Sequence, residues 1–356
     1  MRVNLGDVCE RGSSNLRQSD IEGKTGDYPI FGAAGHIGNV DFYHQEKPYV
    51  AVVKDGAGIG RTTLLPAKSS IIGTMQYLLP KENVLPEYLY YVVRYMHLEK
   101  YFSGATIPHI YFRDYKNEEF NLDELDRQAE IIDILGRVER VIGCRKQELQ
   151  QLDNLIKARF VEMFGDPVAN PKGWETYQLN DCLKWIDNGK SFVCSDKPRG
   201  GDYPAVLKLS AATYGDYRPE ENKALLDENQ FVEGAEVHAG DLLFTRKNTP
   251  ELVGMAAYVH ETPERLMMPD LIFRLVTNDR MNPVFLWQLI NCKEFRPIIQ
   301  GISGGSAKSM SNISKERLGR INVICPPRQI QDQLVPFAHQ VDKSKQAREY
   351  SGKLAA

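Results

Sequence analysis

The sequence lacks most of the features that mark secretion, membrane insertion or a metal site. Its seven histidines include no H-E-x-x-H spacing, and its cysteines include no C-x-x-C pair. No apolar run is long enough to span a bilayer, and Met1–Asp7 lacks the apolar core of a signal peptide. The formal net charge is -3, so a nucleic-acid partner would need a local basic surface. We therefore expect a cytoplasmic protein with reduced thiols, no disulfide framework and no metal site.

The segment 125–164 organises the rest of the chain. Its apolar residues alternate at spacings of four and three, a pattern typical of a coiled-coil helix rather than an ordinary core helix. The seam consists of Ile131, Leu135, Val138, Ile142, Leu149, Leu152, Ile156 and Met163. Asp123 is a candidate N-cap, and Gly165 followed by Pro167 predicts the end of the helix. At about 60 Å this helix is longer than one compact domain needs, so we expect a partner helix.

The part of the chain before this helix has a counterpart after it. In the first part we expect strands at 49–54, 61–65 and 71–79, a helix opening at Pro86 and a short strand near Phe120. Four matches recur in the same order, and a fifth pairs Arg127-Gln128 with Arg328-Gln329. The four are 26–29 with 201–204, 49–65 with 242–257, 85–89 with 282–286, and 103–106 with 303–306. This order predicts a duplicated domain followed each time by a helix.

The second helix is expected after Pro327. Ile330, Leu334, Phe337 and Val341 continue the spacing of four and three. Pro336 would cost about 3 kcal/mol inside a helix, which predicts a kink or a helix that begins near Pro336. We expect a mixed α/β fold in which two similar domains are joined by a long antiparallel two-helix coiled coil, with a pseudo-twofold internal repeat.

This order of elements resembles the specificity subunit of type I restriction-modification enzymes along essentially the whole chain. The resemblance is carried by Pro326-Pro327-Arg328-Gln329 leading into 337–345, and by Lys54-Asp55-Gly56-Ala57 after a strand. It implies a non-catalytic subunit that recognises a bipartite double-stranded DNA target, one half-site per target-recognition domain. Those domains would be 1–122 and 166–326, carried on helical segments 123–165 and 327–356, of which the second is shorter.

The resemblance also implies partners. The chain would dock two methyltransferase subunits and, through them, motor-nuclease subunits. S-adenosylmethionine, ATP and Mg would be bound by those partners, and this chain would bind no cofactor.

A catalytic alternative would use the loop from Gly56 to Gly60 as a methyltransferase or dinucleotide-binding loop. The dinucleotide pattern needs glycine where Arg61 stands, and the residues that follow predict a strand instead of a helix N-terminus. A tight hairpin explains at least two of the three glycines. No N-P-P-Y-like motif occurs in the chain.

Polar and basic residues recur in corresponding loops of the two halves, and these are our candidate DNA contacts. Arginine and lysine can pair with guanine and asparagine with adenine, while most other contacts go to phosphate. The candidates are Lys54, Arg61, His109 and Tyr111 in the first half, and Arg246, Lys247, Asn248, Lys308, Ser309 and Asn312 in the second. A scaffold that binds only proteins is the alternative, in which these would be ordinary surface residues.

Apolar residues outside the seam of the long helix indicate a second surface. They are Ile134, Val141, Leu155 and Phe160, together with Gly136 and Gly143 one heptad apart. Two helices alone do not need this much apolar surface. We expect a docking face for methyltransferase helices, with burial against the recognition domains as the alternative.

Overall fold

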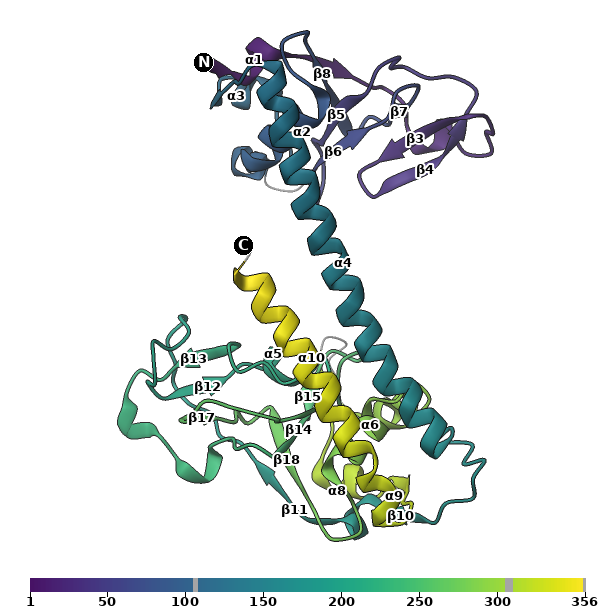
Figure 1. Ribbon diagram of the computed structural model, residues 1–356, viewed down its shortest axis with the longest axis vertical. Coiled ribbons are helices and arrows are strands. Elements are labelled where there is room, and N and C mark those ends of the chain that lie inside the picture. The colour runs from purple at the N-terminus through teal and green to yellow at the C-terminus, as the bar shows by residue number, and fades with distance from the viewer. Residues whose placement is uncertain (105–107, 305–309, 355–356) are drawn as a thin grey trace. The chain divides into compact units, whose positions relative to one another are not determined.

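The computed structural model describes residues 1–104, 108–304 and 310–354, with 346–354 described by backbone alone. The chain folds into two compact units, Met1–Gly143 and Cys144–Ala356. Helix α4 (Leu125–Phe164) runs through the boundary between them, so each unit contains part of this helix (Figure 1).

The first unit contains two sheets and a short ribbon. Its four-stranded antiparallel sheet has the order β2 (Cys9–Ser13), β8 (Met75–Pro80), β5 (Tyr49–Val53), β6 (Thr62–Leu65). Its three-stranded sheet has the order β4 (Gly35–Val40), β3 (Tyr28–Gly32), β7 (Ser70–Ile71), and β1 (Arg2–Asn4) pairs with β9 (Glu119–Asn121). The helices are α1 (Leu5–Val8), α2 (Pro86–Tyr95) and α3 (Phe112–Tyr115). The single strand expected at 71–79 is wrong, because β7 and β8 belong to different sheets.

The second unit repeats this topology. Its four-stranded sheet has the order β11 (Leu183–Asn188), β18 (Ile272–Thr277), β14 (Leu242–Thr245), β16 (Ala256–Tyr258). Its three-stranded sheet has the order β13 (Asn222–Ala224), β12 (Ala205–Leu207), β17 (Leu266–Met267). In both units the last of these strands pairs in parallel, β7 with β3 and β17 with β12. The predicted duplication is therefore confirmed.

The remaining elements of the second unit are two ribbons and several helices. β10 (Thr176–Gln178) pairs with β20 (Asn322–Ile324), and β15 (Lys247–Asn248) pairs with β19 (Ser311–Asn312). The helices are α5 (Ser210–Thr213), α6 (Pro283–Asn291), α7 (Arg296–Gly301), α8 (Lys315–Gly319), α9 (Arg328–Asp332) and α10 (Leu334–Leu354).

A buried glutamine joins each repeat to its helix. Gln128 accepts from the Leu85 N–H (2.9 Å) and donates to the carbonyls of Asn83 (3.0 Å) and Asp123 (2.8 Å). Gln331 accepts from the Asn282 N–H (2.8 Å) and donates to the carbonyls of Arg280 (2.8 Å) and Pro326 (2.6 Å). Gln331 is thus the counterpart of Gln128, and the predicted match of Arg127-Gln128 with Arg328-Gln329 is wrong.

Helix α4 covers the predicted residues, 125–164. Its first turn differs from the prediction, because the Glu124 carbonyl accepts from the Gln128 N–H (2.9 Å) and so occupies the N-cap position. The Asp123 carboxylate accepts instead from the Tyr88 hydroxyl (2.9 Å). Gly165 ends the helix with φ +78°, as its position predicts.

Helix α10 runs antiparallel to the C-terminal part of α4 within the second unit (Figure 1). Lys345 forms ion pairs with Asp153 of α4 and with Asp216 (3.3 Å). Further along, Phe160 of α4 lies in the same core as Leu334 and Ala338 of α10. The predicted antiparallel pairing is confirmed for this part of the helix. Pro336 lies in the first turn of α10, where a proline is tolerated.

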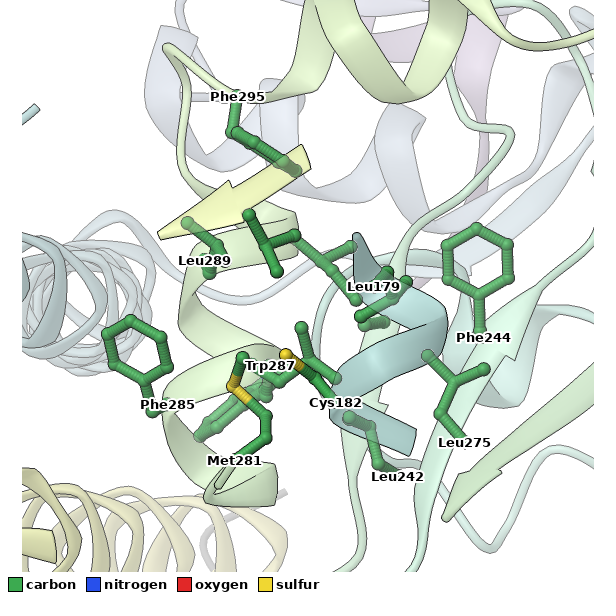
Figure 2. Packing of buried hydrophobic residues seen from close by; sticks show 14 of the residues in the cluster. Leu179, Cys182, Leu242, Phe244, Leu275, Met281, Phe285, Trp287, Leu289 and Phe295 are labelled. Atoms are coloured by element: carbon green, nitrogen blue, oxygen red, sulfur yellow. The ribbon is translucent and has the colours of Figure 1, made fainter. Parts of the chain in front are cut away.

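The core of the second unit is built around α6 (Figure 2). Phe285 of α6 packs against Phe160 and Phe164, with ring centroids 5.5 and 4.7 Å apart. Burying each such ring contributes about 1.5–3 kcal/mol, which fixes the C-terminal part of α4 to this unit. Phe160 is only 1% exposed. Its predicted place on a docking face is therefore wrong, and burial, the alternative, is correct.

Candidate nucleic-acid interface

The candidate site of the first unit lies where β5 ends and the loop to β6 begins. The Lys54 N–H donates to the Thr74 carbonyl (3.0 Å), and the Lys54 carbonyl accepts from the Ile110 N–H (3.0 Å). Gly60 closes the loop with φ +79°, and a Cβ there would lie 2.6 Å from the Glu99 nitrogen. Because β5 and β6 pair as antiparallel neighbours, the predicted glycine hairpin is confirmed.

The second unit builds the same backbone framework from different residues. The Arg246 N–H donates to the Leu271 carbonyl (3.0 Å), and its carbonyl accepts from the Ile313 N–H (2.8 Å). Asp55 forms a β-bridge with His109, and Lys247 pairs with Asn312 at the same point. Lys54, Asp55 and His109 therefore correspond to Arg246, Lys247 and Asn312.

The neighbouring loop closes in the same way in both units. Ser103 and His109 exchange two backbone hydrogen bonds (2.8 and 2.9 Å), and Gly304 and Asn312 exchange two as well (2.8 Å each). Ser103 is thus the counterpart of Gly304. The predicted match between the two loops is therefore confirmed. The pairing of individual residues differs from the prediction by one position, because Ser103 corresponds to Gly304 and not to Ser303.

Side chains of the first unit form a polar cluster on this framework. The Lys54 ammonium lies 2.5 Å from one oxygen of the Asp55 carboxylate, and His109 Nδ1 contacts the other oxygen. The His109 ring lies 4.1 Å from that of Tyr111, which in turn stacks with the Arg113 guanidinium at 4.5 Å. The structure therefore brings together three of the four predicted residues of this unit.

Arg61 is the fourth predicted residue of the first unit, and it points elsewhere. It donates to the Ala33 carbonyl (3.0 Å). Its guanidinium also lies near Gly58, within the hairpin. Among the described residues, no contact links Arg61 to the cluster.

In the second unit Arg246 is the centre of the cluster. Its guanidinium donates to Asn312 Oδ1 (3.2 Å) and Asn188 Oδ1 (3.4 Å), and lies over the Phe273 ring at 5.0 Å. Lys247 is half-buried beside it. The predicted residues Arg246, Lys247 and Asn312 are therefore neighbours.

Asn248 does not belong to this surface. It is 7% exposed, its amide donates to the Thr213 hydroxyl (3.1 Å), and its Oδ1 accepts from the Thr249 N–H (2.9 Å). Because the side chain is buried and both ends of its amide bind within the fold, it is not available to a base edge, and this prediction is wrong. Lys308 and Ser309 lie outside the described residues.

Asp55, Arg113 and Asn188 contact predicted residues of the two clusters but were not themselves predicted from the sequence. Asp55 had a usable signal, because it follows Lys54 directly at the end of a strand. Asn188 had none, since only the pairing of β11 with β18 brings it close to Arg246.

The predicted docking face of α4 is exposed except for Phe160, which is buried, and Gly136, which is half-buried. Ile134 and Val141 are each 55% exposed and Leu155 is 48% exposed. A Cβ on Gly143 would meet nothing within 4 Å. Two seam residues of the first unit, Val138 and Ile142, are also 43% and 47% exposed. The apolar surface of α4 in the first unit is thus wider than predicted.

A groove of about 460 Å³ lies in the first unit between α2 and α4, beside Gly136. Tyr90 and Tyr91 line it from α2. By the correspondence of the two buried glutamines, the counterpart of Gly136 is His339, whose ring packs 4.7 Å from that of His260. Glycine thus supplies no side chain at the position where the second unit has an imidazole.

Among the described residues, no group of three or more His, Cys, Asp or Glu side chains could hold a metal ion. In the same part of the chain, no helix is long and apolar enough to cross a membrane.

Comparison with known proteins identifies the family. The sequence model described as "Type I restriction modification DNA specificity domain" matches residues 1–154 and 171–351. The chain belongs to this family. Its two matches coincide with the two repeats, which places one copy of the family's domain in each half.

Individual members of the family align with only part of this chain. The chain is 32% identical over 167 residues to the type I restriction enzyme EcoEI specificity subunit of Escherichia coli, covering 46% of this chain and 28% of that protein. It is 24% identical over 181 residues to the MjaVIII specificity subunit of Methanocaldococcus jannaschii, covering 47% and 42%. The chain thus matches less than half the length of these relatives.

One solved structure supports the fold. The S subunit of the type I restriction-modification system from M. genitalium aligns with a TM-score of 0.61 at 14% identity, covering 100% of this chain and 92% of that one.

Proposed function

We propose that this chain recognises a bipartite DNA sequence, one half-site per repeat, as the specificity subunit of a type I restriction-modification complex. The observation that carries the proposal is the duplicated polar framework, in which Lys54 and His109 correspond to Arg246 and Asn312. The family model is described as a DNA specificity domain and matches this chain twice, which supports the same function.

The chemistry of the two clusters suits base edges better than phosphates alone. Each cluster holds an imidazole or an amide against a charged side chain, Asp55 in the first unit and Arg246 in the second. Polar side chains fixed in this way can discriminate base edges in the major groove. Cations such as Arg113 would supply the salt-dependent phosphate contacts.

In this proposal the recognition domains are 1–122 and 166–326, and the helical segments 123–165 and 327–356 link them and carry the partners. Two methyltransferase subunits, and through them motor-nuclease subunits, would dock on α4 and would hold S-adenosylmethionine, ATP and Mg. The chain itself would act without catalysis in the cytoplasm, where these partners find DNA. Ile134, Gly136, Val141, Gly143 and Leu155 remain the docking residues that we propose.

Methylome sequencing of cells with and without this chain tests the proposal. A bipartite methylated motif that is present only with the chain is the expected result. A gel shift of the purified chain on that motif should weaken steeply as salt rises, because phosphate contacts release counterions. A chain that binds the methyltransferase but never DNA would instead be the protein-only scaffold.

A further inference from the structure

His109 and Asn312 occupy the same position in the two units, yet they offer different chemistry. Both residues exchange two backbone hydrogen bonds across their loop, and both lie opposite the second residue after a strand, Asp55 after β5 and Lys247 after β14. Each side chain also contacts a charged partner on that strand end, Asp55 in the first unit and Arg246 in the second. The charges of these partners are opposite, and this decides which atoms of the side chain remain available.

In the first unit the carboxylate of Asp55 can only accept a hydrogen bond. His109 Nδ1 must therefore carry the proton that it donates to Asp55. Lys54 lies 2.5 Å from the other oxygen of the same carboxylate. When Nδ1 carries the proton of a neutral imidazole, Nε2 is an acceptor, and Nε2 of His109 has no partner among the described residues.

In the second unit the guanidinium of Arg246 can only donate. Asn312 must therefore turn Oδ1 toward it, at 3.2 Å, and this leaves the amide NH₂ group as a pair of donors. No described residue takes these donors. The same backbone position thus offers an acceptor in one unit and donors in the other.

We propose that residues 109 and 312 are equivalent base-recognising positions, and that Asp55 and Arg246 are positioning residues that set the hydrogen-bonding polarity of each. This inference rests on the proposed function. The first unit would contact a base amino group, as on adenine or cytosine. The second would contact an acceptor edge, as on guanine, thymine or adenine N7.

Selection of the full chain on a randomised duplex library, followed by sequencing, tests the second unit with Asn312→Asp. Aspartate keeps the shape and the acceptor for Arg246 but removes the NH₂ donors. Preference at one base pair of one half-site should fall by about tenfold or more, and the other half-site should be unchanged. Asn154→Asp, the same change on an exposed part of α4, should alter neither half-site.

For the first unit the test is Asp55→Asn, which leaves His109 in place. An amide can donate to Nδ1, which moves the imidazole proton to Nε2 and turns the outward acceptor into a donor. Preference in the other half-site should then shift, as it should in His109→Asn. Asp41→Asn, an exposed control in the same unit, should have no effect.

The outcomes separate the two proposals. If the unmodified chain enriches no sequence, the proposed function fails. If it enriches a bipartite motif that Asn312→Asp and Asp55→Asn leave unchanged while their urea midpoints match the unmodified chain, this inference is overturned and the proposed function stands. Should Asp55→Asn unfold the first unit, Asn312→Asp decides alone, because its shape and its bond from Arg246 are retained.

Discussion

Two buried glutamines show how single side chains join the helices to the sheets. Gln128 and Gln331 are each 0% exposed, and each satisfies one backbone N–H and two backbone carbonyls. Removing such a side chain leaves buried backbone groups without partners, which costs more than the net value of the bonds themselves.

Gln331→Ala and Gln128→Ala should each destabilise the unit that contains it. We expect a loss of about 1–3 kcal/mol in the free energy of unfolding, measured from urea midpoints by circular dichroism. Gln151→Ala, on an exposed position of α4, is the control and should change the midpoint little. Equal midpoints for all three variants would contradict the joining role.

His260 predicts a pH dependence in the second unit. Burial, with smaller contributions from His339 and Lys345, lowers the pKa of His260 from 6.5 to about 4, and neither ring nitrogen has a hydrogen-bond partner among the described residues. As the pH falls from 6.5 to 4, the unfolded chain binds a proton that the folded chain does not bind. This contribution to stability is therefore complete above pH 6.5 and is lost toward pH 4.

His260→Phe should reduce the loss of urea midpoint between pH 6.5 and 4. Burial raises the pKa values of Asp241 and Asp342, whose effects have the opposite sign but are shared by both proteins and cancel in the comparison. His36→Gln, on an exposed residue, should leave the pH profile as it is. If the urea midpoint of His260→Phe falls between pH 6.5 and 4 as much as that of the unmodified chain, His260 is not the source of the acid sensitivity.

At the scale of elements, α4 combines a buried end with an exposed apolar middle. Its C-terminal part is fixed by Phe160 and Phe164, whereas Val141 and Leu155 face solvent. Val141→Asp with Leu155→Asp should leave a folded chain that no longer co-purifies with its methyltransferase partner, because charges would replace the apolar docking face.

Asn154→Asp supplies a matched control for the docking test, since it adds a charge to an exposed residue of the same helix. It should still co-purify with the partner. Normal assembly of the double variant would remove the argument for this face, and an unchanged circular dichroism spectrum would show that loss of assembly is not loss of folding.

The elements that could be predicted are those whose signal is local. The spacing of four and three predicts α4 through all of its residues, Gly60 predicts a hairpin, and Pro86 predicts the start of α2. Phe160 and Asn248 were placed wrongly because their burial depends on α6 and α5, far away in the sequence. The role of Asp55 depends likewise on a bridge to His109 that no local pattern marks.

At the scale of the whole molecule, duplication has kept the backbone framework and changed the side chains. His109 with Asp55 and Asn312 with Arg246 stand on the same hydrogen-bonded strand ends. Exchanging residues 1–122 for the corresponding domain of another family member should therefore change one half-site only, which selection on a randomised duplex library would report. A change in both half-sites would contradict independent recognition.

The length of α4 leads to the last prediction. The helix enters both units without interruption, so inserting residues in its exposed middle, between Cys144 and Arg145, lengthens the connection without touching either cluster. Four residues add about 6 Å and a turn of about 40°. One base pair adds about 3.4 Å and a turn of about 35°. The recognised bases should stay the same while the spacer between half-sites grows by one to two base pairs, as measured by selection on duplexes with random spacers.

An insertion of two residues would turn the second unit by about 200° and should abolish simultaneous binding of both half-sites. An unchanged spacer in the four-residue variant would mean that direct contact between the recognition domains, and not the helix, measures the DNA.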